Sequence, residues 1–289
     1  DVYKRQQLNF LGTGVPYWYY ISGNNIIKEQ VPSKRDMEKQ LDKFLEEKIS
    51  ECNFQNFEEQ GYLVDFDKAR VSTSIKDDKI EVNVNMPLTI SFNGDSVRAA
   101  NHKVSVNSEL GKFYNSALKI YDKEKKEAFL EHYAEDVLRL YAPVDGVELT
   151  CAPKIWSKNE ISEKLRDALE ANMQAIKSGQ EKSYFVQNLG IEENVRFLYS
   201  KNWPTRIEIY DKGDFLVAEP VGLQQGLGIL GFCYVPYHFI YDINYPVLVQ
   251  IFDENELFQK IDLLKPVSYT HLRAHETSLH LVCRLLLAK

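Results

Sequence analysis

The chain has 289 residues, 44% of them hydrophobic, and a formal net charge of −7 at pH 7. This length allows one large domain or two smaller ones with a substantial core. The net charge is negative and the lysines and arginines form no basic block, which argues against a nucleic-acid-binding protein. We therefore expect an acidic globular protein with no nucleic acid among its partners.

The two ends of the chain differ from the rest of the sequence. DVYKRQ at residues 1–6 and VSYTHLRAHET from Val267 onward are direct translations of transposase and adaptor ends used in sequencing libraries. We interpret residues 1–6 and 267–289 as translated adaptor around a fragment of metagenomic origin. The first segment carries a charge of +1 and the last +2, so the remaining residues carry −10. The closely spaced histidines of the last segment are therefore no candidates for a metal site.

Residues 7–142 are predicted to form one region, in which a helix accompanies an antiparallel meander. Its aromatic and turn-rich beginning predicts extended structure. Ser33, with Asp36 three residues later, resembles a capping box, and apolar residues then recur at helical spacing. The charged side of this helix, which includes Asp42 and Glu46, is predicted to face solvent without a partner.

The meander is predicted over residues 61–106. Strict alternation of apolar and polar side chains over residues 80–92 indicates a long strand with one buried face. Asn93 and Gly94 follow it directly, and Asn-Gly between alternating segments is a strong signal for a tight hairpin. Pro87 cannot donate to a strand ladder, so it predicts an edge or a bulge within this strand.

Helical periodicity covers residues 108–140, with a bend predicted in the charged segment 122–127. A further helix is predicted through residue 176, because Ser157 and Glu160 have the spacing of a capping box.

Residues 143–266 are predicted to form a second α+β region that contains the core strands. Residues 218–252 are the most apolar and aromatic part of the chain, and segments 230–241 and 247–252 are predicted to pair through a short turn. The order of elements predicts an α+β fold: an antiparallel sheet meander with packed helices and a second, aromatic-rich antiparallel sheet region.

His238 and Asp242 are the candidate catalytic residues, because residues four apart on a strand share a face, and Tyr241 lies between them. They could act as a base and its orienting carboxylate in a secreted hydrolase, with Ser200 or Cys233 as nucleophile. No nucleophile motif accompanies them. A buried hydrogen-bond network of the three side chains is therefore the preferred interpretation, and a non-enzymatic role is favoured.

Glycines at positions 226, 228 and 231 satisfy the G-x-G-x-x-G pattern of dinucleotide-binding proteins. That pattern binds a pyrophosphate at the beginning of a helix, and the sequence predicts no helix after these glycines. We therefore predict no cofactor.

Three cysteines lie between the two adaptor-like segments. Cys151 and Cys233 lie on or beside predicted core strands, and a disulfide between them would suit an oxidising compartment. Cys52 is then left over, which would be natural if its partner preceded the present N-terminus. The alternative is that all three are free, buried thiols in an intracellular globular protein.

Five segments carry a resemblance to known sequences: PYWYY, PSKRDMEKQL, PLTISFNGDSV, KNWPTRIEI and GFCYVPYHFIYDINYPVLVQIFD. They resemble an uncharacterised family of archaeal single-pass envelope proteins, and the similarity covers most of residues 14–260. Members typically have an N-terminal membrane helix and a large domain outside the cell, without an established activity. The resemblance implies a truncated extracytoplasmic domain, anchored through a missing N-terminal helix, with other envelope proteins or surface glycans as partners. We therefore expect a non-enzymatic role in envelope structure, adhesion or assembly.

Overall fold

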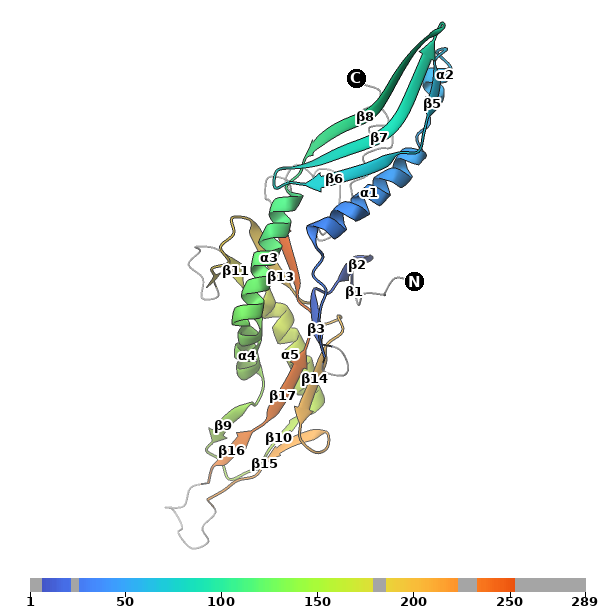
Figure 1. Ribbon diagram of the computed structural model, residues 1–289. Helices are drawn as coiled ribbons and strands as arrows, with labels where there is room; N and C mark the ends of the chain where they lie inside the picture. Colours follow the sequence, from blue (N-terminus) through green and yellow to red (C-terminus); the bar gives the residue numbers. More distant parts are fainter. Residues whose placement is uncertain (1–6, 22–25, 179–185, 223–232, 253–289) are drawn as a thin grey trace. The chain divides into compact units, whose positions relative to one another are not determined.

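The computed structural model describes residues 7–21, 26–178, 186–222 and 233–252 (Figure 1). Both adaptor-like ends and the three glycines of the G-x-G-x-x-G pattern lie outside the described residues. The chain divides into two compact units, and the division falls between Ser116 and Ala117.

The first unit begins with two short antiparallel hairpins, as its extended beginning predicted. In the first, β1 (Gln7–Phe10) pairs with β2 (Thr13–Pro16), and in the second, β3 (Tyr19–Ile21) pairs with β4 (Ile27–Glu29).

Helix α1 (Lys34–Ser50) follows, and the predicted capping box is confirmed at its beginning. The backbone N–H of Asp36 donates to Ser33 Oγ at 3.1 Å, and the N–H of Ser33 donates to Asp36 Oδ2 at 3.4 Å. These bonds satisfy donors that the first helical turn leaves without partners. The short helix α2 (Gln55–Glu58) comes next.

The predicted meander is a four-stranded antiparallel sheet. The long strand β7 (Lys79–Phe92) pairs along one side with β8 (Asp95–Asn107) and along the other with β5 (Leu63–Phe66) and β6 (Arg70–Ile75). The Asn93-Gly94 hairpin is confirmed, since both residues have positive φ angles, 49° and 93°. The predicted bulge is confirmed as well, because the β7–β8 register shifts between Asn85 and Leu88, around Pro87.

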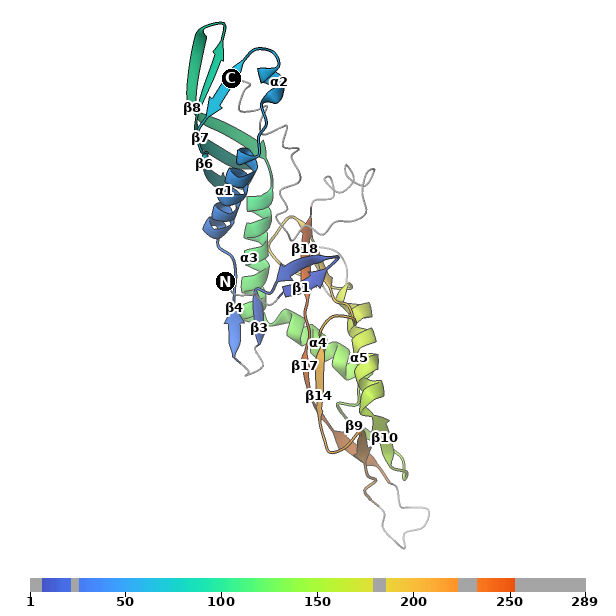
Figure 2. The ribbon, with the colours of Figure 1, turned by 90° about the vertical axis from the view of Figure 1, so that its right-hand side faces the viewer.

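Helix α1 lies alongside β6 in both views (Figure 1 and Figure 2). Three acidic side chains of α1, spaced four residues apart, accept hydrogen bonds from alternate backbone N–H groups of β6. Four helical residues rise about 6 Å and two strand residues about 6.8 Å, so the two repeats stay in step over this length. The prediction that Asp42 and Glu46 lack partners is therefore wrong. We call the three acidic residues the carboxylate ladder: Glu38 binds Ile75 N–H, Asp42 binds Thr73 N–H and Glu46 binds Val71 N–H.

The core of the first unit lies between α1 and the sheet. It joins Ile49 of α1 to buried side chains of β6 and β7 and of the segment before β6, and Leu45 and Val82 pack against it. Burial of this apolar face is the main force that holds the helix on the sheet. The buried strand and segment residues are Ala69, Val71, Val84 and Met86.

Helix α3 (Leu110–Glu127) crosses the division between the two units, and α4 (Phe129–Tyr141) follows it. The predicted bend in segment 122–127 is wrong, because α3 continues through this segment and the break falls at Ala128, which has a φ of 49°. No side chain at Ala128 can cap α4. Instead, the carboxylate of Glu124 reaches forward and accepts the Leu130 N–H at 3.0 Å.

Helix α5 (Lys158–Met173) begins at the predicted cap, where Ser157 accepts from the backbone N–H of Glu160. It ends at Met173 rather than at residue 176. Helices α4 and α5 pack against each other, which explains why α4 belongs to the second unit. The sequence predicted a division between residues 142 and 143, just after α4, whereas the two compact units divide between Ser116 and Ala117.

The described strands of the second unit form small ladders, four of which are antiparallel. Strand β9 (Asp145–Glu148) pairs with β16 (Val235–His238), and β10 (Lys154–Ser157) pairs with β15 (Phe215–Ala218). Strand β14 (Arg206–Tyr210) pairs with β17 (Ile240–Asn244), and β13 (Asn194–Leu198) pairs with β18 (Leu248–Phe252). A short parallel pair joins β11 (Lys177–Ser178) to β12 (Val186–Gln187).

The predicted pairing of segments 230–241 and 247–252 is wrong. Strand β16 and the beginning of β17 lie in the first segment, and β18 lies in the second. Within the described residues, these strands each pair with an earlier strand and not with one another. Pro246 restricts the backbone of Tyr245 toward extended conformations, which favours a straight passage from β17 to β18 over a tight turn. The fold is nevertheless α+β with antiparallel sheets, as the sequence predicts.

Candidate functional site

The predicted catalytic pair is not assembled in the second unit. His238, at the end of β16, faces Asp145 across the β9–β16 ladder, with 3.8 Å between Nδ1 and Oδ1. Their side chains are 69% and 76% exposed. Asp242 lies on β17 opposite Glu208 of β14, and it is exposed too. The preferred interpretation, a buried network of His238, Asp242 and Tyr241, is therefore wrong.

Tyr241 is half-buried and bonded elsewhere. Its hydroxyl donates to the backbone carbonyl of Pro143 at 3.0 Å. Burial, with a smaller contribution from Tyr237, raises the pKa of Tyr241 to about 12. This side chain therefore fastens β17 to the segment that follows α4, and its role is structural.

Neither nucleophile candidate is bonded to His238 or Asp242 in the described part of the chain. Cys233 is bonded to Cys151. The Ser200 hydroxyl donates to Glu170 Oε1 at 3.0 Å and accepts the Asn202 N–H at 3.4 Å. Within the described ranges, no three histidine, cysteine, aspartate or glutamate side chains lie together as metal ligands would.

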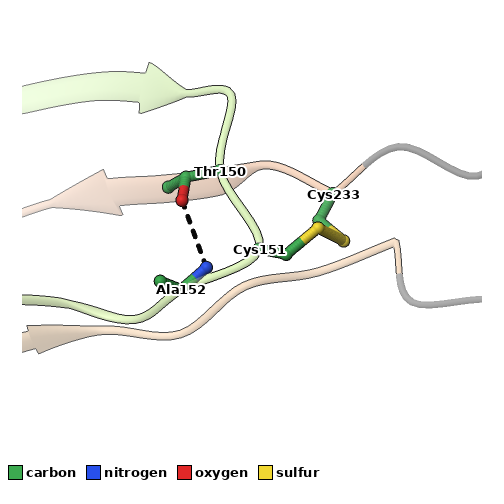
Figure 3. The surroundings of a disulfide bond; sticks show 4 residues. All are labelled: Thr150, Cys151, Ala152 and Cys233. Atoms are coloured by element: carbon green, nitrogen blue, oxygen red, sulfur yellow. Dashed lines mark hydrogen bonds between the residues drawn. A yellow bond between two sulfur atoms is a disulfide. The ribbon is translucent and has the colours of Figure 1, made fainter.

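The disulfide between Cys151 and Cys233 is confirmed (Figure 3). It joins the loop between β9 and β10 to the segment that enters β16, across a sequence separation of 82 residues, with an S–S length of 2.04 Å. In the same loop, the Ala152 N–H donates to Thr150 Oγ1 at 3.1 Å. The alternative of three free thiols is therefore wrong, because no cysteine among the described residues is free; Cys52, just after α1, is buried.

Next to this disulfide, the β10–β15 ladder exposes an apolar face. Ile155 and Val217 are cross-strand partners and are 62% and 47% exposed. Phe215, two residues before Val217 on the same side of β15, is 55% exposed. Clusters of exposed large apolar side chains are typical of interaction surfaces.

A shallow hollow of about 480 Å³ lies on the sheet of the first unit. Its floor is formed where three strands run side by side, and the side chains of Val71, Val84 and His102 point to the buried face. The alternate positions point outward and are exposed and polar. We call these six residues the polar patch: Arg70 and Ser72 of β6, Asn83 and Asn85 of β7, and Asn101 and Lys103 of β8.

The strand register arranges the polar patch in two rows across the sheet. The first row is Arg70, Asn85 and Asn101, and the second is Ser72, Asn83 and Lys103. Within the first row, Asn85 Nδ2 donates to Asn101 Oδ1 at 2.7 Å. The sequence predicted one solvent-exposed face for β7. It gave no signal that Arg70 of β6 and Lys103 of β8 would lie beside that face.

The two cations of the polar patch are not neutralised by a neighbour. Among the described residues, neither Arg70 nor Lys103 has a carboxylate within 4 Å. Lys103 interacts electrostatically with Glu81, but Glu81 forms its ion pair with Lys79, with 3.0 Å between Oε1 and Nζ. The polar patch therefore combines two positive charges with amide and hydroxyl groups that can donate and accept hydrogen bonds.

Comparisons with protein-family models, with curated proteins and with solved structures return no match. No helix in the described ranges combines the length and the apolar character needed to cross a bilayer.

Proposed function

We propose that this chain is a non-enzymatic extracytoplasmic domain of a membrane-anchored archaeal surface protein, acting in envelope structure, adhesion or assembly. The resemblance of residues 14–260 to archaeal envelope proteins supports both the location and the anchor.

The Cys151–Cys233 disulfide is the observation that carries this proposal. Disulfides form and persist mainly in oxidising compartments, whereas cytosolic thiols are kept reduced. The bond also lies beside the exposed apolar face of β10 and β15. A stabilised region that presents apolar side chains suits contact with another envelope component.

A non-enzymatic role is favoured by the geometry around His238. A catalytic base needs a nucleophile or substrate proton within hydrogen-bond reach and a partner that orients the imidazole. His238 and Asp145 are both largely exposed, and their nearest polar atoms are 3.8 Å apart. The secreted hydrolase is therefore less well supported than the surface protein, and the disulfide disfavours the intracellular alternative.

The proposal is tested by producing the full chain in two compartments of a bacterial host, the oxidising periplasm and the reducing cytoplasm. We expect the folded periplasmic protein to give a Cys151–Cys233 linked peptide in a non-reducing peptide map. The cytoplasmic protein should lack it and should unfold at lower denaturant concentration. If both preparations have equal stability and their thiols stay free under added oxidant, the protein belongs inside the cell and the proposal fails.

A further inference from the structure

We propose that the polar patch on the sheet of the first unit binds an acidic polysaccharide, a chain of sugar rings that bear carboxylates. This inference rests on the proposed function and names a ligand class for adhesion. The patch consists of Arg70, Lys103, Ser72 and the three asparagines, which are among the residues that line the hollow.

Charge complementarity indicates an anionic ligand. The chain as a whole is acidic, with a net charge of −7, yet Arg70 and Lys103 present two positive charges without an ion-pair partner among the described residues. They occupy diagonal corners of the two rows. With strands about 4.8 Å apart and about 6.8 Å between alternate residues, the corners lie roughly 12 Å apart. A repeating anionic chain can reach both corners, whereas a single small anion can reach only one.

The polar side chains between these corners suit sugar hydroxyls. A carboxamide offers both a donor and an acceptor, and a serine hydroxyl can act as either. Asn83, Asn85, Asn101 and Ser72 therefore match neighbouring hydroxyls that both give and accept hydrogen bonds. The bond between Asn85 and Asn101 holds two of the amides in place before a ligand arrives, which reduces the entropy lost on binding.

Other polymers fit this face less well. An extended peptide binds to the edge of a sheet, where backbone groups are free, and the hollow lies on the face, where they are already paired. An amphipathic helix needs an apolar groove, but the outward side chains here are polar. Single-stranded nucleic acid needs aromatic platforms for its bases, and the six residues of the polar patch include no aromatic side chain.

The test measures binding of the full chain by isothermal titration calorimetry to three probes: polygalacturonate, neutral dextran and poly-glutamate. We expect saturable binding to polygalacturonate and none to dextran. The double variant Arg70→Gln/Lys103→Gln should weaken binding at least about tenfold, because it removes two charge-assisted contacts. The variant Asn83→Ala should also weaken binding, although it leaves the charge unchanged.

The matched control is Lys39→Gln/Lys43→Gln on the exposed side of α1, which changes the net charge by the same amount. It should bind polygalacturonate within about twofold of the parent. Equal loss in both double variants would show non-specific attraction and overturn the proposal. Equal or tighter binding of poly-glutamate would assign the face to an acidic peptide instead. Thermal unfolding of each variant verifies its fold, and a negative result here leaves the disulfide test of the proposed function unaffected.

Discussion

The Asp42 carboxylate accepts two hydrogen bonds from Thr73, one from the backbone N–H at 2.6 Å and one from the side-chain hydroxyl at 2.7 Å. Thr73 lies on β6, whose other side pairs with β7, so this contact occupies the free edge of the sheet. Free edges are prone to pair with other chains, and proteins commonly cover or charge them. The carboxylate ladder of α1 covers this edge and satisfies its N–H groups.

Replacement of Asp42 by alanine should destabilise the first unit by about 2 kcal/mol, because hydrogen bonds to a charged acceptor contribute about 1.5 to 3 kcal/mol. Urea unfolding gives the free energy of unfolding, and amide hydrogen exchange should show faster exchange of the Thr73 N–H. Lys43→Ala is the control, since the Lys43–Glu47 pair is exposed and its atoms are 3.8 Å apart. If both substitutions change the free energy of unfolding equally, the carboxylate ladder does not stabilise the first unit.

Removal of the disulfide by Cys151→Ser/Cys233→Ser should lower the stability of the second unit by about 4.5 kcal/mol, by the chain-entropy relation for a loop of this length. Differential scanning calorimetry should show the transition of the second unit shifted and that of the first unit unchanged. A reductant should lower the transition temperature of the second unit in the parent protein. It should leave the transitions of the double variant unchanged. A shift of both transitions together would mean that the bond stabilises more than its own unit.

His238→Ala should leave the free energy of unfolding within about 0.5 kcal/mol of the parent value, since the imidazole is 69% exposed. Tyr241→Phe, which removes the bond to Pro143, should cost about 1 kcal/mol. Chemical denaturation of both variants checks the contrast. A large loss of stability in His238→Ala would support the buried network after all. If the protein has a hydrolase activity and His238→Ala abolishes it while the fold stays intact, the enzyme hypothesis would be supported instead.

The second unit should lose stability above about pH 10. Burial raises the pKa of Tyr241 from its ordinary value of 10.0 to about 12, so the folded state holds this proton longer than the unfolded state does. Stability from this group is complete below pH 10 and falls as the pH rises toward 12. Burial raises the pKa of Tyr199 and Tyr245 as well, so Tyr241→Phe should reduce the slope of stability against pH and not abolish it. An unchanged slope in the variant would exclude Tyr241 as a contributor.

Glu124→Gln should become increasingly more stable than the parent as the pH rises from about 4 to 7. Burial raises the pKa of Glu124 above 4.5, although the hydrogen bond from Leu130 opposes this shift. The contribution of protonated Glu124 to the free energy of unfolding is therefore present at low pH. It is lost as the pH rises through the pKa that Glu124 has in the folded state. Glutamine keeps an oxygen acceptor for Leu130 and carries no charge. Urea unfolding of both proteins across this range measures the difference, and a difference that stays constant with pH would exclude burial of Glu124 as its source.

Local signals in the sequence predicted much of the first unit. The Ser33–Asp36 capping box, the Asn93-Gly94 turn and the bulge at Pro87 each depend on backbone preferences within a few residues. Such preferences can be judged from a short segment, and all three predictions are confirmed.

Contacts between distant segments could not be predicted in this way. The partner of β17 is β14, and the partner of His238 is Asp145, because tertiary packing selects these pairs from many compatible strands. The residues of the carboxylate ladder and of the polar patch are common surface residue types, and no local sequence pattern marks them. Their arrangement depends on the register between elements, which periodicity alone does not specify. The disulfide could be proposed because cysteines are few and their chemistry is specific.

The separation between Cys151 and Cys233 also has a consequence for synthesis. The ribosome adds about 5 to 20 residues per second, so the first thiol waits roughly 4 to 16 s for its partner, which follows 82 residues later. During that interval Cys151 can form mixed disulfides with other thiols. A translation product that stops before residue 233 therefore carries a reactive cysteine, which distinguishes it chemically from the finished protein.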